Sequence, residues 1–371
     1  MFSKSIVPPE GFRSLSEFTD TNPLRVWLNQ TYATNYWIIG MIRNNPENVP
    51  ISIYATSDRA GSPVLQAGDH VALEPDRDEL SGDAYADWAL EYAKANRIDV
   101  FIPMRGMIAI SARIADFEAL GTKVLVSPHD SVTLLDDKNL TYASAKENGI
   151  AVPPWYIASS TAELELAYET LRSELEPEEE IVIKPVQGVG AGGFRVIKNE
   201  RMSMKDILEK PKRQISIREL LEVFANTEAE GKKVPAFMVL PYLDEPEVSI
   251  DCLSDFDGRI IAAVPRSKNK SLRTLASDTQ ITIDLAVKMS ETYRLRYLTN
   301  TQVRWFREQP VLLETNTRIS GGMYASALAG INLTWEGIKL ALTGAVNEPF
   351  DIHLGGTFTN LSSVVPFTKY I

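Results

Sequence analysis

Short apolar runs alternate with amphipathic stretches through the first third of the chain. From residue 36 the runs are YWIIGMI, ISIYAT, HVALEP, DVFIPM and KVLVS, and the segments 83–96 and 107–120 between the later runs are amphipathic. This alternation predicts a parallel, doubly wound sheet. The first run continues as IGMIRNNP and lacks the G-x-G-x-x-G pattern of a dinucleotide site. We therefore expect a Rossmann-like scaffold with a structural or substrate-side role.

The pattern changes after residue 126. The stretch 127–149 is typical of a loop that enters a helix, and Pro153 and Pro154 mark a boundary after it. IVIKPVQGVGAGGFRV, at 181–196, then predicts a strand, a glycine-rich turn and a second strand. Charged helical segments are expected at about 203–210 and 215–230.

The last third of the chain combines strands with helices. AFMVLPYL, EVSIDCLS and RIIAAVPRSK are predicted strands, separated by turns at Glu245-Pro246 and Asp257-Gly258, and DFDG is a hairpin signal. We expect a helix at about 280–294, strands at 297–306 and 310–315, and a final helix at about 333–345.

Composition narrows the class of protein. With 371 residues, 44% of them apolar and 23% charged, the chain should be folded throughout and contain two or three domains. The net charge of −11 disfavours nucleic acid and anionic membranes as partners. Cys252 is the only cysteine, which excludes an internal disulfide and a thiolate metal cluster. No apolar run has the length of a membrane helix, and we expect a soluble cytoplasmic protein.

The glycine-rich turn is the first candidate binding element. Glycines let successive backbone N–H groups approach phosphate oxygens, and Lys184 on the adjoining strand would supply a countercharge. The turn lies between two strands, so it is neither a P-loop nor a dinucleotide fingerprint, which both lead into a helix. The alternative is an ordinary glycine-rich hairpin with a surface lysine.

A second candidate is a set of oxygen-bearing side chains on two apolar strands. Gln302 lies in TNTQVRWF, and Glu314 and Asn316 lie in PVLLETN, with the polar turn REQP between the strands. If the strands pair as a hairpin, the three side chains can meet at one end of the sheet. Amide and carboxylate oxygens suit Mg²⁺, which takes further ligands from phosphates. Without this context, they would be ordinary residues at strand ends.

Four segments in order resemble the ATP-grasp superfamily, and within it the carbamoyl phosphate synthetase large subunit and the D-alanine:D-alanine ligase type of enzyme. They are the DK helix that ends in GIAVPPW, IVIKPVQGVGAGG, PYLDEPEVSID, and QVRWFREQPVLLETNTRISGG. The resemblance implies an α/β and α+β chain. An N-terminal Rossmann-like (pre-ATP-grasp) parallel sheet at 1–130 would precede a two-subdomain ATP-grasp fold, with a lid subdomain at 131–240 and a catalytic subdomain at 241–371.

The resemblance also implies nucleotide contacts, with ATP between two β-containing subdomains. Lys138 and Lys184 would contact the α- and β-phosphates, and Glu247 would accept hydrogen bonds from the ribose hydroxyls. The backbone of Pro241 and of Leu243 would meet the adenine edge. The loop that would close over the phosphates contains Gln187, Gly188, Gly190, Gly192 and Gly193. Many members of the family have a glutamate where this chain has Leu240, so the usual side-chain contact to the adenine amino group is in doubt.

The metal set and three arginines complete the implied site. Gln302, Glu314 and Asn316 match the positions that bind Mg²⁺, or Mn²⁺, in the synthetase-like branch. Arg318 matches an arginine that faces the acyl phosphate, and RISGGMYAS would border the acceptor pocket. We expect either Arg266 or Arg273, in VPRSKNKSLRT, to steady the γ-phosphate or the acyl phosphate. A solvated basic loop is the alternative for these two.

The implied activity is ATP-dependent ligation. A small-molecule carboxylate would be activated as an acyl phosphate and joined to an amine or similar nucleophile, with ADP and phosphate released. By the same resemblance a homodimer is possible. Two other functions are alternatives: an ATP-binding sensor or regulatory module without turnover, and an NAD-dependent oxidoreductase. The complete metal set disfavours the sensor, and the missing phosphate-loop glycines disfavour the oxidoreductase.

Overall fold

The structure is a computed structural model that describes residues 11–30, 33–188, 192–199, 213–269, 272–277, 279–360, 364 and 366. Contacts divide the chain into two compact units. The first unit comprises Met1–Thr133, Val248–Gln302 and Thr315–Ile371, and the second comprises Leu134–Glu247 and Val303–Glu314. The helix expected at 203–210 and the candidate Gly190 lie outside the described residues. The division into three domains stays a prediction.

The first unit contains the parallel sheet expected from the alternating pattern, with strand order β3-β2-β1-β4-β5. Every neighbouring pair in it is parallel, and Val26 pairs with both Ile53 and Val100. The strands are β1 (Leu24–Asn29), β2 (Ile51–Ser57), β3 (His70–Leu73), β4 (Val100–Ile102) and β5 (Lys123–Val124). The predicted doubly wound sheet is therefore confirmed.

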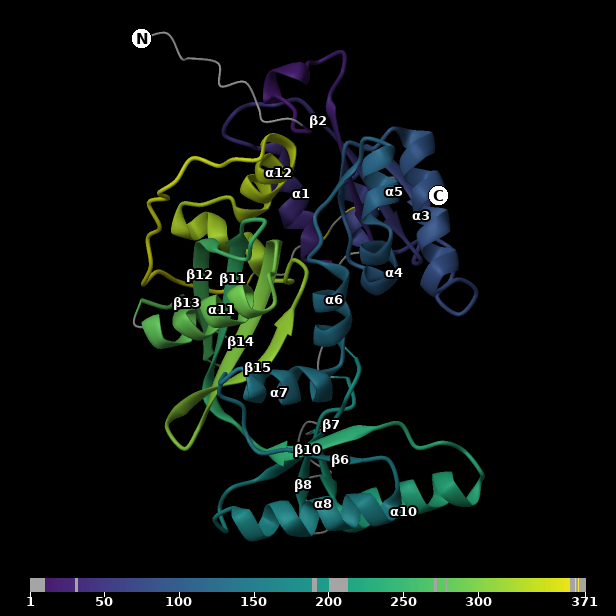
Figure 1. Ribbon diagram of the computed structural model, residues 1–371, viewed down its shortest axis with the longest axis vertical. Helices are drawn as coiled ribbons and strands as arrows, with labels where there is room; N and C mark the ends of the chain where they lie inside the picture. The colour runs from purple at the N-terminus through teal and green to yellow at the C-terminus, as the bar shows by residue number, and fades with distance from the viewer. Residues whose placement is uncertain are drawn as a thin grey trace. The chain divides into compact units, whose positions relative to one another are not determined.

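Helices cover both faces of this sheet because successive strand side chains point to opposite faces. Leu24, Val26 and Leu28 of β1 join one buried cluster, and Trp27 joins another. Figure 1 shows α1 and α12 on one side of the sheet and α3, α4 and α5 on the other. The helices of this unit are α1 (Asn35–Arg43), α2 (Pro63–Ala67), α3 (Gly82–Asn96), α4 (Met107–Ala112), α5 (Ile114–Ala119), α11 (Gln280–Thr292), α12 (Leu333–Thr343), and the 3₁₀ helices η1 (Leu15–Glu17) and η2 (Met323–Ala329).

The sequence-based assignment of YWIIGMI as the first strand is wrong, because this run is helix α1. The first strand is LRVWLN, which precedes it. A short apolar run does not distinguish a strand from a buried helix by periodicity alone. Here Ile38, Ile39 and Ile42 are all buried, which a helix achieves when it packs against several neighbours. The helix expected at 107–120 is present but is interrupted at Arg113, between α4 and α5.

The second unit is built on a five-stranded sheet with the order β6-β10-β7-β8-β9. Its elements are α7 (Lys138–Glu147), β6 (Tyr156–Ala158), α8 (Thr161–Glu174), β7 (Ile181–Pro185), β8 (Arg195–Lys198), β9 (Gln214–Ser216), α10 (Ile217–Ala229) and β10 (Phe237–Pro241), and α6 (His129–Asp136) leads into them. Strands β7 and β8 pair antiparallel on either side of the glycine-rich turn, as predicted. Figure 1 shows α8 and α10 across one face of the sheet and α7 on the other.

A six-stranded sheet with the order β15-β14-β11-β12-β13-β16 completes the fold. Its strands are β11 (Asp244–Ser254), β12 (Ile260–Asn269), β13 (Leu272–Leu275), β14 (Tyr297–Phe306), β15 (Gln309–Asn316) and β16 (Thr357–Phe358). The hairpin of β14 and β15 is present as expected. The DFDG turn joins β11 to β12, and Gly258 has φ +91°, with the Ser290 carbonyl 2.5 Å from where a Cβ would lie. The turn expected at Glu245-Pro246 is wrong, because both residues belong to β11.

Among the described residues, no helix has the length and apolar character needed to cross a membrane.

Candidate functional site

Lys184 of the second unit is a buried cation with few hydrogen-bond partners in the part of the chain that the structure describes. It lies on β7 between Val182 and Val186, whose side chains join an apolar cluster. Lys184 is 8% exposed, and among the described residues its ammonium makes one hydrogen bond, a long one of 3.4 Å to the Tyr142 hydroxyl. Burial lowers the pKa of Lys184 to about 8, against the opposing effect of Glu314, and Lys138 lowers it further. An ammonium can donate three hydrogen bonds, so this position is suited to receive an anion.

Lys138 joins the same region from the first residue of α7. Its Nζ donates to the Gly188 carbonyl at 2.8 Å and to the Val186 carbonyl at 3.4 Å. The Asp137 side chain caps the helix by accepting from the Leu140 N–H. A helix start carries partial positive charge. The segment that leaves β7 is therefore flanked by two lysines and a helix N-terminus.

Glu314, on β15, supplies the negative charge near Lys184. Glu314 raises the pKa of Lys184, which opposes the lowering caused by burial. It also raises the pKa of Tyr142, in the same direction as burial. The Tyr142 hydroxyl donates to the Leu313 carbonyl at 3.0 Å, which anchors α7 to β15. Lys184 and Glu314, which the sequence placed in separate motifs, thus share one electrostatic environment.

The described part of the glycine-rich turn has the backbone geometry that requires glycine at two positions. Gly188 has φ +130°, with open space where a Cβ would lie. Gly193 has φ +72°, and a Cβ there would lie 2.6 Å from Pro185 Cγ. Gln187 and Gly192 are exposed. Whether these residues bind phosphate stays a prediction.

The residues expected to bind adenine and ribose have protein partners in this structure. Arg304 Nη1 donates to the Leu243 carbonyl at 3.0 Å, and Arg304 Nε lies 3.4 Å from Glu247. Pro241 is buried at the end of β10. Leu240 is buried in the apolar cluster that includes Tyr142, so its side chain adds apolar surface where a glutamate would have added a carboxylate.

The other candidate metal positions lie on β14 and β15. The hydroxyl oxygens of Thr301 and Thr315 are 3.1 Å apart, so these two side chains share one face of the hairpin. Because side chains alternate, Gln302 and Asn316 leave the opposite face, as does Glu314 two residues before Asn316. Within the described ranges no three acidic, histidine or cysteine side chains gather as a metal cluster, so this set would contribute a single carboxylate.

Arg266 is buried in the first unit, so the solvated alternative is wrong for this residue. Its Nε donates to Asp251 at 2.7 Å, and its Nη2 donates to the hydroxyls of Ser249 at 3.4 Å and Ser320 at 3.2 Å. A Cβ on Gly322 would lie 2.5 Å from Arg266 Nη1, so this glycine makes room for the guanidinium. The catalytic role of Arg266 stays a prediction.

The two other candidate arginines are half-buried. Arg273 lies on β13, where its backbone is paired with Lys268 of β12 and Phe358 of β16. The Arg318 guanidinium donates to the Ile319 carbonyl at 3.2 Å. Their assignment to the phosphate or acyl phosphate also stays a prediction.

Three important residues were missed by the sequence analysis. Tyr142 supports Lys184, Asp251 pairs with Arg266, and Arg304 pairs with Glu247. A usable signal existed for Asp251, because EVSIDCLS places a carboxylate in the apolar centre of a strand, where it needs a buried partner. No comparable pattern marks Tyr142 or Arg304.

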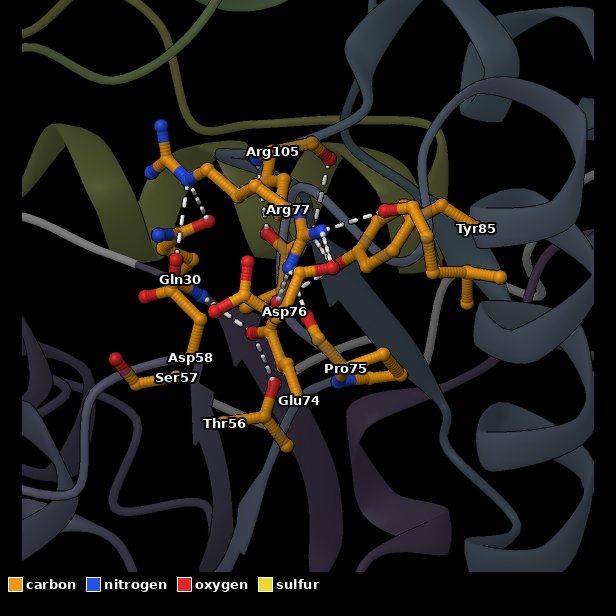
Figure 2. Close-up of polar contacts among 12 residues, drawn as sticks. Gln30, Thr56, Ser57, Asp58, Glu74, Pro75, Asp76, Arg77, Tyr85 and Arg105 are labelled. Atoms are coloured by element: carbon orange, nitrogen blue, oxygen red, sulfur yellow. Dashed lines mark hydrogen bonds and ion pairs between the residues drawn. The ribbon is translucent and has the colours of Figure 1, made fainter.

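At the carboxyl edge of the parallel sheet, where doubly wound proteins bind ligands, Glu74 follows β3 and is bound by other residues of the protein. The Glu74 carboxylate accepts four hydrogen bonds, from Gln30 N, Thr56 Oγ1, Tyr85 OH and Arg105 Nη1. Figure 2 shows Arg105 directed toward Glu74 and the loop that begins at Pro75, where it also donates to backbone carbonyls. These contacts indicate that Arg105 has a structural role. They give no support to a dinucleotide site.

Comparison with known proteins adds a family and a set of folds. Residues 233–363 match the family model described as "ATP-grasp in the biosynthetic pathway with Ter operon". No curated protein matches the chain at a significant level.

Three solved structures illustrate the similarity of fold. N5-carboxyaminoimidazole synthetase from Staphylococcus aureus, complexed with ADP, has a TM-score of 0.61 at 13% identity, covering 89% of this chain and 80% of its own. L-amino acid ligase from Bacillus licheniformis has a TM-score of 0.57 at 16% identity, covering 86% and 74%. The biotin carboxylase domain dimer of 2-oxoglutarate carboxylase from Hydrogenobacter thermophilus, in complex with MgADP, ADP and bicarbonate, has a TM-score of 0.62 at 15% identity, covering 90% and 73%. At these identities the likeness concerns the fold.

Proposed function

The chain has an ATP-grasp fold, and from this premise we propose that it is an ATP-dependent ligase that activates a carboxylate as an acyl phosphate and joins it to an amine or similar nucleophile. The observation that carries the proposal is the environment of Lys184. Its buried ammonium makes one long hydrogen bond to the described residues and lies near a second lysine, just before a glycine-rich turn. This environment suits phosphate oxygens.

The side chains on β14 and β15 fit a divalent cation. Gln302, Glu314 and Asn316 offer oxygen donors from one face of the hairpin, with one carboxylate among them, which suits a cation that keeps phosphate ligands as well. Mg²⁺ bound there would offset the negative charge of the nucleotide phosphates. Mn²⁺ prefers the same oxygen donors and serves as an experimental substitute.

In the proposed reaction the chain mainly positions and screens charge. Lys138 and Lys184 hold the α- and β-phosphates, which keeps the terminal phosphorus open to attack by the carboxylate substrate. The carboxylate oxygen forms a bond to the γ-phosphorus as the bond to the β,γ-bridging oxygen breaks, and ADP leaves. The nucleophile then attacks the acyl carbon, and inorganic phosphate departs with the bonding electron pair. The glycine-rich turn excludes water from the acyl phosphate while it exists.

The first test is nucleotide binding. We expect wild-type protein to bind ADP more tightly with Mg²⁺ than without it, and Lys184→Ala to lose most of this affinity in isothermal titration calorimetry. Lys232→Ala is the matched control, because Lys232 is an exposed lysine of the same unit that pairs only with the nearby Glu230 among the described residues. Absence of Mg²⁺-dependent ADP binding by the wild-type protein at millimolar concentrations would overturn the proposal.

The second test separates a ligase from a sensor. Phosphate release from ATP is measured on adding pools of amino acids and other small carboxylates, with NADH absorbance followed in parallel. A ligase releases phosphate only with the correct pool, and the product mass identifies the new bond. ADP binding without phosphate release in any pool would favour the sensor.

A further inference from the structure

Asp251 lies at the centre of a buried hydrogen-bond network in the first unit. Its side chain is fully buried on β11, and its Oδ2 accepts from Arg266 Nε at 2.7 Å. Its Oδ1 accepts from Asn300 Nδ2 at 2.8 Å and from Ser320 Oγ at 2.7 Å. A carboxylate ion-paired with an arginine can only accept hydrogen bonds. Every neighbour of Asp251 is therefore forced to act as a donor toward it.

This requirement fixes the orientation of the Asn300 side-chain amide. Asn300 is fully buried on β14, and it must turn its nitrogen, the only donor of its side chain, toward Asp251. The same nitrogen reaches Ser249 Oγ at 2.9 Å and the Ile250 carbonyl at 3.3 Å. The amide oxygen of Asn300, Oδ1, therefore points away from Asp251 and can only accept a hydrogen bond.

Gln302 meets that oxygen. It lies two residues further along β14, on the same face as Asn300, and its Nε2 donates to Asn300 Oδ1 at 3.3 Å. This hydrogen bond fixes the Gln302 nitrogen on the side of Asn300, so its carbonyl oxygen Oε1 points the other way. A directional chain thus runs from the Asp251 carboxylate through Asn300 to Gln302.

The direction matters because glutamine is an ambiguous metal ligand. Its oxygen attracts a cation, whereas its NH₂ group carries partial positive charge and repels one. A glutamate at this position would present an oxygen in either orientation. A glutamine presents its oxygen only if a neighbouring group fixes the orientation of its amide. Hydrogen-bond partners that lie behind metal ligands commonly orient them in this way.

We propose that Asp251 and Asn300 are positioning residues that make Gln302 present its carbonyl oxygen to the divalent cation that accompanies the nucleotide. The inference rests on the proposed function, since it assumes a cation beside Gln302. It also explains why a buried network of Asp251, Asn300 and Arg266 lies next to Gln302 in the same sheet.

The experiment measures binding of Mn²⁺ in the presence of ADP by electron paramagnetic resonance, which requires no turnover. Asn300→Ala removes the middle of the chain, and we expect Mn²⁺ affinity to fall on the order of 10-fold. Asp251→Asn is the second variant. It nearly conserves the shape of the side chain but offers both donor and acceptor groups, so the orientation of the Asn300 amide is no longer imposed.

Ser249→Ala is the control. It removes a bond of 2.9 Å from the same Asn300 nitrogen but keeps the carboxylate, so we expect a change below about twofold.

A rescue variant distinguishes positioning from general structural damage. In a Gln302→Glu background both branches of the side chain are oxygen, so adding Asn300→Ala should no longer weaken Mn²⁺ binding. An equal loss in both backgrounds would overturn the inference, as would unchanged Mn²⁺ affinity in both Asn300→Ala and Asp251→Asn. If wild-type protein with ADP binds no Mn²⁺, the proposed function itself fails and this inference fails with it.

Discussion

Two cations whose side chains are largely shielded from solvent, Arg105 in the first unit and Lys184 in the second, differ in the number of hydrogen bonds they make. Arg105 pairs with Glu74 at 3.2 Å, donates to three backbone carbonyls and lies 4.2 Å from the centre of the Tyr85 ring. Among the described residues Lys184 makes one long hydrogen bond and has a tyrosine ring 5.2 Å away. The Glu314 carboxylate raises its pKa, and a second lysine lowers its pKa. The Arg105 side chain is 9% exposed and Lys184 is 8% exposed, yet among the described residues the arginine donates four hydrogen bonds and the lysine donates one.

The difference shows how a buried charge can be interpreted. A charge whose hydrogen bonds are complete contributes to the fold, and removing it leaves its partner buried and unpaired. A charge whose hydrogen bonds are incomplete destabilises the folded protein unless a ligand completes them. Arg105 therefore has a structural role at the edge of the parallel sheet, whereas the environment of Lys184 supports the proposal that it binds a ligand.

The largest expected effect is the loss of stability when Arg105 is replaced. Arg105→Met leaves the Glu74 carboxylate buried without its cation, and we expect the free energy of unfolding to fall by about 3 to 5 kcal/mol. Differential scanning calorimetry would show this as a marked decrease in Tm. An unchanged Tm would mean that the satisfied network is dispensable and would remove the contrast with Lys184.

Nucleotide affinity should respond to Lys184 and not to Arg105. Lys184→Met removes a charge-assisted hydrogen bond to phosphate, and we expect ADP affinity to fall by about 2 to 3 kcal/mol, or roughly 30-fold to 150-fold. Calorimetric titration of both variants, at a temperature where Arg105→Met is folded, checks the difference. Equal losses in the two variants would contradict the distinction between structural and binding cations.

The same Lys184→Met variant should be more stable than the wild-type protein without nucleotide. At pH 7 the gain is up to about 3 kcal/mol, the free energy represented by a lysine pKa lowered from 10.5 to about 8. Between pH 8 and 10.5 the unfolded chain binds more protons at Lys184 than the folded protein, so wild-type stability rises with pH and the gap narrows. Unfolding curves of both proteins at pH 7 and pH 10 would test this, and a destabilised variant at pH 7 would contradict it.

The smallest expected effect is the pH dependence of binding. Protonated Lys184 favours phosphate, so ADP affinity should be full below pH 8 and fall by up to about tenfold per pH unit above it. Lys184→Arg keeps its charge in this range and should give a flatter profile. A wild-type affinity that is constant from pH 7 to pH 9.5 would place the nucleotide phosphates away from Lys184.

Much of the fold could be predicted from local patterns. Strands β2, β7, β10, β12, β14 and β15 and helices α3, α10, α11 and α12 were expected close to where they lie. The order of the motifs along the chain indicated the ATP-grasp fold, and both the family model and the solved structures support it. These features are encoded locally, because periodicity, glycines and turn residues act over a few neighbouring positions.

Other features required contacts between distant segments. YWIIGMI is a helix because its isoleucines pack into a core shared with α12, which lies near the other end of the chain. From the sequence, a solvated basic loop was the alternative for Arg266, but in the structure it donates to Asp251 and Ser320. The Leu243 carbonyl was expected to be available to adenine, but in the structure it accepts a hydrogen bond from Arg304.

The sequence by itself thus determined most of the elements and their order, and it supplied the candidate residues for binding phosphate and a cation. Only the tertiary structure decided which charges are satisfied and which are left with incomplete hydrogen bonds, as the contrast between Arg105 and Lys184 shows. The physical reason is that hydrogen-bond satisfaction and desolvation depend on groups brought together by folding, which no local pattern along the chain specifies.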